Sequence, residues 1–133
     1  LRTTGGEFGS TTGRPRRCGW FDAVASKYSA ALNGLTAINL TKLDVLDDFD
    51  TIKIGTKYLY QGKELEAFPS SLEILSEVEV IYEEMPGWKE STVAFTSFDQ
   101  LPGRVHRLFQ RRNRDFANHA RPWHPRCRSG LSY

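Results

Sequence analysis

The chain has 133 residues, of which 39% are hydrophobic and 26% are charged, and its net charge is +2. This length suits a single domain with one modest core. No apolar run is long enough to span a membrane, the N-terminus lacks the order of a secretory signal, and two cysteines are too few for a disulfide framework. We therefore expect a cytoplasmic location with reduced thiols. Because the chain starts at Leu1 and its one methionine is Met85, we also expect a fragment or a processed piece.

The charge is unevenly divided along the chain. Residues 104–133 contain eight arginines, no lysine and one acid, Asp115, so they carry +7 and the remainder carries −5. All three histidines also lie in this last part. The change of composition near Gly103 predicts a folded domain over residues 1–103 and a divergent, arginine-rich tail over residues 104–133, which we expect to be disordered.

An eight-residue stretch near the N-terminus combines hydroxyls, a glycine and three arginines. It reads Ser10-Thr11-Thr12-Gly13-Arg14-Pro15-Arg16-Arg17. Gly13 lets the backbone turn where a side chain would clash, and guanidinium groups match the geometry of carboxylates and phosphates. The stretch predicts an anion-binding loop, although a solvated basic turn fits its composition equally well.

A helix is predicted to follow this loop. From Phe21 to Leu32 the apolar residues recur at offsets of three and four, which is typical of an amphipathic helix, and Asn33-Gly34 provides its C-terminal stop. Residues 36–41 then predict a short strand. Lys42-Leu43-Asp44 falls just past the carboxyl end of that strand, where α/β sheets commonly bind ligands.

Asp44 has the chemistry of a guanine reader. A carboxylate can accept hydrogen bonds from N1 and N2 of guanine together, and adenine offers no such pair. The stem of Lys42 can cover the plane of the base. A turn-capping role for Asp44, with Lys42 in water, explains the same residues. The acidic turn that follows, Asp47, Asp48 and Asp50, lacks the glycine and closing glutamate of a calcium loop.

A β-hairpin is predicted next. Residues 52–60 alternate between apolar and polar, Gln61-Gly62 supplies a turn, and residues 64–68 would return antiparallel until Pro69.

Two helices and one strand are predicted in the remaining part of the domain. Ser70 and Glu73 have the spacing of a capping box for a short helix, and residues 78–82 alternate as a strand that a loop at residues 85–88 ends. Thr96 or Ser97 could cap a last helix with apolar positions up to Phe109. From Gln110 onward the periodicity is lost and disorder is expected.

Three segments, taken in order, resemble the C-terminal third of the adenylosuccinate synthetase family. They are Gly6-Glu7-Phe8-Gly9 with Thr11 to Asp22, then Leu40 to Asp47, then Tyr82-Glu83-Glu84-Met85-Pro86-Gly87-Trp88. The resemblance covers about residues 5–102. It implies an α/β fold: an incomplete piece of a larger mixed-sheet α/β domain of a P-loop-NTPase-like synthetase, with a β-hairpin and a disordered basic tail.

The resemblance also implies a reaction. Members of the family are GTP-dependent ligases of AMP biosynthesis, which join IMP and L-aspartate to give adenylosuccinate, GDP and phosphate with Mg²⁺. The implied partners are therefore IMP, L-aspartate and GTP, with a homodimer for the intact enzyme and no membrane.

The resemblance assigns roles to two segments. The family's mobile aspartate loop corresponds to Ser10, Thr11, Thr12, Gly13, Arg14, Pro15 and Arg16. In it Thr11, Thr12 and Arg14 would hold the aspartate carboxylates. Arg14 would also touch the IMP ribose, and Arg16 would contact GTP. Lys42, Leu43 and Asp44 correspond to the family's guanine-recognition segment.

The departures from the family limit these expectations. The phosphate-binding glycine-rich loop, the aspartate base and the assisting histidine of the family lie in its N-terminal part, so no catalytic residue or Mg²⁺ ligand is expected in this segment. The isolated chain is expected to be inactive. The match fades at Leu101-Pro102, so the guanine pocket is expected to be incomplete.

Three interpretations of the tail remain open. A shifted reading frame, an unspliced segment or an alternative exon would explain the abrupt change to arginine. A non-catalytic RNA-binding or regulatory extension could use Trp123 for stacking. A zinc site at His119, His124 and Cys127 would need a fourth ligand.

Overall fold

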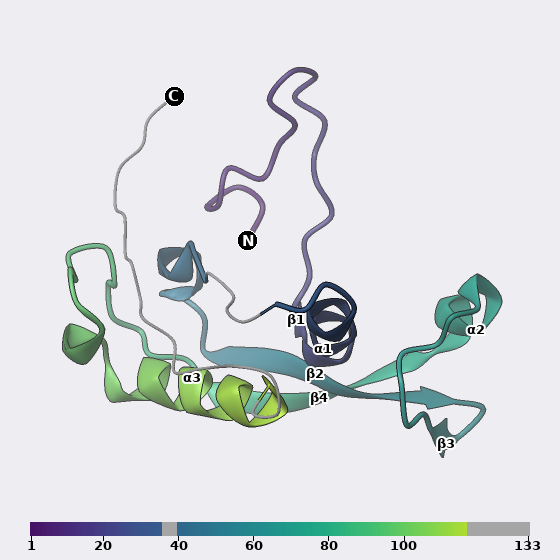
Figure 1. Cartoon of the computed structure of the whole chain (residues 1–133). Coiled ribbons are helices and arrows are strands. Elements are labelled where there is room, and N and C mark those ends of the chain that lie inside the picture. The colour runs from purple at the N-terminus through teal and green to yellow at the C-terminus, as the bar shows by residue number, and fades with distance from the viewer. Residues whose placement is uncertain (36–39, 117–133) are drawn as a thin grey trace.

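A four-stranded mixed sheet organises the part of the chain that the computed structural model describes, which is residues 1–35 and 40–116, with side chains up to residue 110 (Figure 1). The central strand β2 (Thr51–Tyr60) pairs with all the others. It runs parallel to β1 (Phe21–Asp22) and antiparallel to β3 (Lys63–Glu64) and β4 (Glu79–Pro86). The α/β class with a mixed sheet is therefore confirmed.

The alternating pattern of β2 has the predicted consequence. Ile52, Ile54 and Tyr58 are buried, as is Gly55, whereas Lys53, Thr56 and Lys57 are more exposed. Gln61 and Gly62 both have positive φ values, 50° and 77°, as a tight two-residue hairpin turn requires. The predicted strand and its turn are confirmed.

The return strand of this hairpin is shorter than predicted. Only Lys63–Glu64 pairs as β3, whereas the sequence predicted a strand over residues 64–68. Phe68 instead stacks on Tyr28 of the first helix, with ring centroids 4.7 Å apart. Phe68 also packs against Tyr58 of β2, with ring centroids 6.0 Å apart, so the chain stays beside β2 although ladder pairing ends at Glu64.

Helix α1 (Ala23–Leu32) begins two residues later than its periodicity predicted. Phe21 and Asp22 pair with β2 as the short strand β1, and the Asp22 carboxylate accepts a hydrogen bond from the Ala25 amide at 3.0 Å. Asp22 is therefore the N-cap, outside the helix. The C-terminal stop is confirmed, since Asn33 is the C-cap and Gly34 has φ 59°.

The boundaries of α2 (Leu72–Glu77) and β4 also differ from the prediction. Ser71, not Ser70, caps α2, because its Oγ accepts a hydrogen bond from the Ile74 amide. Strand β4 continues through Pro86, which was placed in a loop. Proline has no N–H to donate but is tolerated at the end of a strand. The next residue, Gly87, donates its N–H to the Asp50 carbonyl at 2.7 Å.

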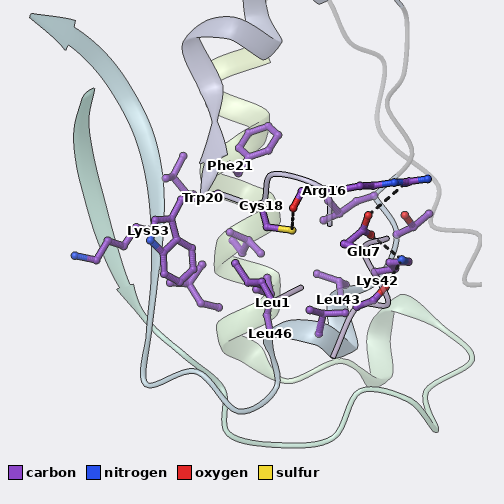
Figure 2. A pocket seen from close by; sticks show the side chains of 18 of the residues that line it. Leu1, Glu7, Arg16, Cys18, Trp20, Phe21, Lys42, Leu43, Leu46 and Lys53 are labelled. Carbon is purple, nitrogen blue, oxygen red and sulfur yellow. Dashed lines mark hydrogen bonds and ion pairs between the residues drawn. The ribbon is translucent and has the colours of Figure 1, made fainter. Parts of the chain in front are cut away.

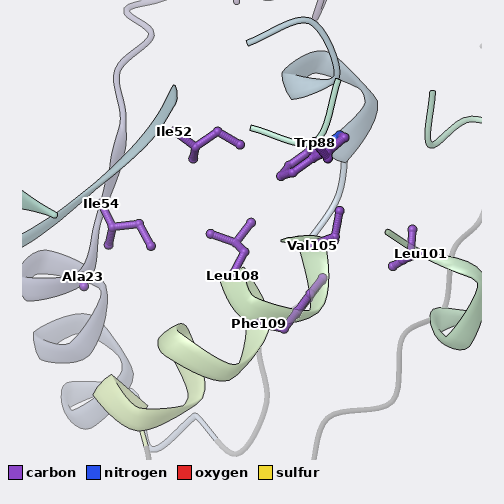
Figure 3. Close-up of a cluster of buried hydrophobic side chains, with 8 residues drawn as sticks. All are labelled: Ala23, Ile52, Ile54, Trp88, Leu101, Val105, Leu108 and Phe109. Atoms are coloured by element: carbon purple, nitrogen blue, oxygen red, sulfur yellow. The ribbon is translucent and has the colours of Figure 1, made fainter. Parts of the chain in front are cut away.

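The core lies between the sheet and helix α3 (Gly103–Phe116), with α1 beside it. Figure 3 shows Leu108 pointing toward Ile52 and Ile54, with Val105 and Phe109 on the same helix. Val105 has no exposed surface at all. One side of α3 is therefore an integral wall of the core.

Two predictions about this last helix are wrong. Ser97 caps a separate 3-10 turn, η2 (Phe98–Gln100), and α3 starts only at Gly103 because Leu101, which precedes Pro102, adopts an extended conformation. The helix then runs to Phe116, beyond the expected end at Phe109. The strand predicted for residues 36–41 and the tail after residue 116 fall largely or wholly outside the described residues.

Candidate functional site

The predicted anion loop is the tip of a narrow hairpin that stands away from the sheet (Figure 1). Phe8 and Pro15 pair across it, and the Arg16 amide donates to the Glu7 carbonyl at 3.0 Å. Nearer the tip, the Gly9 amide donates to the Arg14 carbonyl at 2.8 Å. Backbone pairing therefore fixes the shape of the stem.

The tip itself is open to solvent. All residues from Ser10 to Gly19 are exposed, and Gly13 turns the chain with φ 63°. Thr12 Oγ1 accepts a hydrogen bond from the Arg14 amide at 3.4 Å. The guanidinium of Arg14 makes no hydrogen bond or ion pair with any other described residue, so it is available to a ligand.

The base of the hairpin is tied to the second predicted segment by one carboxylate. Glu7 Oε1 accepts a hydrogen bond from Lys42 Nζ at 2.7 Å, and Glu7 Oε2 forms an ion pair with Arg16 Nη1 at 3.4 Å (Figure 2). Lys42 Nζ also donates to the Gly5 carbonyl at 2.6 Å. The hydrogen bond and charge of Lys42, followed by the charge of Arg16, lower the pKa of Glu7 below its ordinary value.

A cavity of about 480 Å³ lies beside this base (Figure 2). Its wall is largely apolar, and its cations are Arg16, Arg17, Lys42 and Lys53. Trp20, which also lines it, packs edge-on against Phe49 with ring centroids 5.4 Å apart. An apolar wall with several cations suits a ligand that has a flat ring and anionic groups.

The structure brings together only some of the predicted site residues. Arg16, Lys42 and Leu43 line the cavity, whereas Thr11, Thr12 and Arg14 lie at the hairpin tip, outside its wall. Asp44 is exposed in the first turn of η1 (Leu43–Leu46) and is also outside the wall. Within the described residues its carboxylate makes no hydrogen bond or ion pair.

The short helix η1 owes its position to two neighbours. Lys42 precedes it in the left-handed conformation, with φ 58° and ψ 42°. Asp47 follows it and accepts three hydrogen bonds: from the Trp88 indole at 2.7 Å, the Thr92 amide at 2.8 Å and the Thr92 hydroxyl at 2.9 Å. The segment predicted to recognise guanine is thus held from both ends.

Sequence reasoning missed Asp47 and Glu7. Asp47 was grouped with Asp48 and Asp50 as an acidic turn, but its carboxylate accepts hydrogen bonds from the buried residues Trp88 and Thr92. The one available signal was Trp88, whose indole N–H needs an acceptor when the ring is buried. Asp50 instead pairs with Lys89 at 2.9 Å. No cluster of three His, Cys, Asp or Glu side chains within the described residues could hold a metal ion.

The sequence profile described as "Adenylosuccinate synthetase" matches residues 1–114. The chain belongs to the adenylosuccinate synthetase family. It is 58% identical over 111 residues to the adenylosuccinate synthetase of Geotalea daltonii and 56% identical over 102 residues to that of Dictyostelium discoideum. These alignments cover 84% and 77% of this chain but only 26% and 24% of the relatives. The chain thus spans about a quarter of their length.

A solved structure of the family has the same fold. The fully ligated adenylosuccinate synthetase of Plasmodium falciparum matches with a TM-score of 0.82 and 37% sequence identity, over 87% of this chain and 28% of that one. The interpretation as a synthetase segment is therefore confirmed, and the comparisons give no support to the RNA-binding alternative. No helix within the described residues is long and apolar enough to cross a membrane. The proposed zinc ligands lie beyond residue 116, outside the described part.

Proposed function

We propose that this segment contributes the L-aspartate loop and the guanine-recognition element of a GTP-dependent synthetase, which joins IMP and L-aspartate to give adenylosuccinate, GDP and phosphate. The observation that carries the proposal is the cavity at the base of the hairpin, because Arg16 of the first predicted segment and Lys42 of the second lie on its wall.

The exposed tip supports the aspartate assignment. In the proposal, Thr11, Thr12 and Arg14 bind the two carboxylates of L-aspartate, and Arg14 also reaches the IMP ribose. The Arg14 guanidinium has no other partner in the described part of the chain, so it can form two parallel hydrogen bonds with a carboxylate. Closure of the tip over the substrate would exclude water and strengthen each contact.

The region around η1 supports the GTP assignment. Arg16 would contact the phosphates of GTP, and Lys42 with Leu43 would cover the base from the cavity wall. The exposed carboxylate of Asp44 could then accept hydrogen bonds from N1 and N2 of guanine.

We propose that Mg²⁺ and the proton-transfer groups come from other parts of a synthetase, as the family resemblance implies, and no step through them is derived for this segment. A homodimer and a cytoplasmic location stay predictions.

The guanine assignment is tested in a chimera. Residues 1–114 of this chain replace the matching segment of the Geotalea daltonii synthetase, and adenylosuccinate formation is measured with GTP and with ITP, which lacks the N2 amine. Asp44→Asn should raise the KM for GTP about tenfold and that for ITP clearly less, because a hydrogen bond from N2 to a charged acceptor is lost only with GTP.

Asp48→Asn provides the matched control, because this neighbouring aspartate is exposed and its backbone carbonyl, not its carboxylate, is used by Lys89. It should leave both KM values unchanged. Equal increases for GTP and ITP in Asp44→Asn would contradict guanine recognition by this residue.

A further inference from the structure

Glu7 stands between the two segments of the proposed nucleotide site. We propose that Glu7 is a positioning residue, which holds Lys42 against the base of the hairpin and so sets the place of the guanine segment relative to the anion loop. This inference rests on the proposed function and goes beyond it, since the proposed function assigns Glu7 no contact with nucleotide or aspartate.

The contacts of Lys42 carry the first step. Its ammonium group donates to Glu7 Oε1 at 2.7 Å and to the Gly5 carbonyl at 2.6 Å, so two acceptors on one short segment hold it. Both acceptors lie more than thirty residues away along the chain. Because Lys42 immediately precedes η1 and has a left-handed backbone, its tether also fixes where η1 begins.

The contact to Arg16 carries the second step. The Arg16 guanidinium is 3.4 Å from Glu7 Oε2, so this pair is longer than the 2.7 Å pair with Lys42, although the two cationic side chains are about equally exposed, at 59% and 54%. Lys42 also has a second acceptor, the Gly5 carbonyl, and the Arg16 guanidinium has no second acceptor among the described residues. Arg16 can therefore exchange Glu7 for a phosphate group, whereas Lys42 stays bound. Glu7 thus distinguishes a cation that is retained from a cation that can be released.

The charge of the cavity carries the third step. Among the described residues that line it, Glu7 is the one acid beside four cations. Without this carboxylate, Lys42 and Arg16 would repel each other and Lys42 would lose one of its two acceptors. The lowered pKa of Glu7 agrees with a carboxylate that stays ionised in this setting.

The kinetic test uses the same chimera. Glu7→Gln should raise the KM for GTP and for ITP by the same factor, about fivefold, because it displaces the residue that covers the base without touching the N2 amine. The control is Glu64→Gln, which removes an ion pair of similar length, 2.8 Å to Lys57, on the β2–β3 hairpin away from the cavity. It should change neither KM.

The double variant separates positioning from general structural support. If Glu7 acts through Lys42, Lys42→Gln alone should raise the KM at least as much, and Glu7→Gln should add nothing in that background. Independent, multiplying effects would overturn the inference. So would unchanged KM values in Glu7→Gln when Asp44→Asn still discriminates GTP from ITP. If Asp44→Asn does not discriminate, the proposed function fails instead.

Amide hydrogen exchange on the 133-residue chain gives a measurement that needs no activity. The Arg16 amide donates to the Glu7 carbonyl, and the Gly9 amide to the Arg14 carbonyl. Glu7→Gln should speed exchange at both amides severalfold and leave β2 unchanged, and Glu64→Gln should not affect them. Unaltered exchange at Arg16 and Gly9 would show that Glu7 does not hold the hairpin.

Discussion

Arg14 is the single residue on which the proposed aspartate clamp depends most. Its guanidinium is exposed and makes no other interaction within the described residues, so its removal should leave the fold intact. In the chimera, Arg14→Ala should raise the KM for L-aspartate at least tenfold, because a charge-assisted contact to a carboxylate is lost. Initial rates at varied L-aspartate measure this.

Arg107→Ala is the matched control for Arg14, because Arg107 is an exposed arginine on the solvent side of α3. Its KM for L-aspartate should equal that of the parent. An Arg14 variant with the parent's KM for L-aspartate would refute the loop assignment.

The residue types predicted which side chains are exposed at the hairpin tip. They did not predict which side chains bind other parts of the chain. The hydroxyls and arginines of the tip lie in solvent, as an anion loop requires. Glu7 and Asp47 could not be found in this way, because their partners Lys42 and Thr92 are distant in sequence. Gly87 illustrates the same limit. The sequence placed it in a loop that ends a strand. In the structure a Cβ at this position would lie 1.8 Å from the Phe49 carbonyl oxygen, so the close approach of the two backbones requires a glycine.

At the scale of elements, the hairpin of residues 7–16 should respond to acid. Lys42 and then Arg16 hold the pKa of Glu7 below its ordinary value, so its ion pairs contribute stability above the ordinary pKa of a glutamate and are lost as the pH falls through the lowered pKa. The carbon-13 shift of the Glu7 carboxyl group should therefore titrate with a midpoint below that of an ordinary glutamate.

Lys42→Gln should return that midpoint toward the ordinary value, because Lys42 is the largest cause of the lowering. A midpoint that does not move in this variant would show that Lys42 and Glu7 do not interact in solution.

Element types were predicted better than element ends. The periodicities of α1 and β2 were sufficient because each continues over about ten residues. The ends depend on tertiary contacts. Phe21 pairs with Ile54 and so lies outside the helix, and β3 ends at Glu64, after which Phe68 packs on Tyr28 and Tyr58. Such tertiary contacts override local propensity and cannot be read from spacing.

At the scale of the whole molecule, the division of the chain at residue 103 stays a prediction, and α3 makes it testable. A chain ending at residue 103 would lack Val105, Leu108 and Phe109, which are at most 8% exposed in the core. Loss of each such side chain costs about 2–5 kcal/mol, and a typical domain has only about 5–15 kcal/mol of stability.

A chain of residues 1–103 should therefore show no cooperative thermal transition by circular dichroism, whereas a chain of residues 1–116 should melt like the full chain. A cooperative transition in the shorter chain would mean that α3 is dispensable and that the compositional boundary is also the structural one.

The family was predicted from three short motifs, and the fold class was predicted from that resemblance. What composition could not show is that the arginine-rich part contributes to the core. The apolar residues of α3 keep helical spacing up to Phe109 although the charge changes sharply near Gly103. Net charge describes the surface of a segment, and the buried side is determined by a few apolar positions.

The central position of β2 affects the order in which the sheet can fold. Because β1, β3 and β4 all pair with β2, no pair of these strands can form before residues 51–60 are present. Pairing of β2 with β3 closes a loop of only a few residues. Pairing of β2 with β1 closes a much longer loop, which has a greater entropic cost. During synthesis from the N-terminus, the segment that carries the predicted anion loop leaves the ribosome before β2 does.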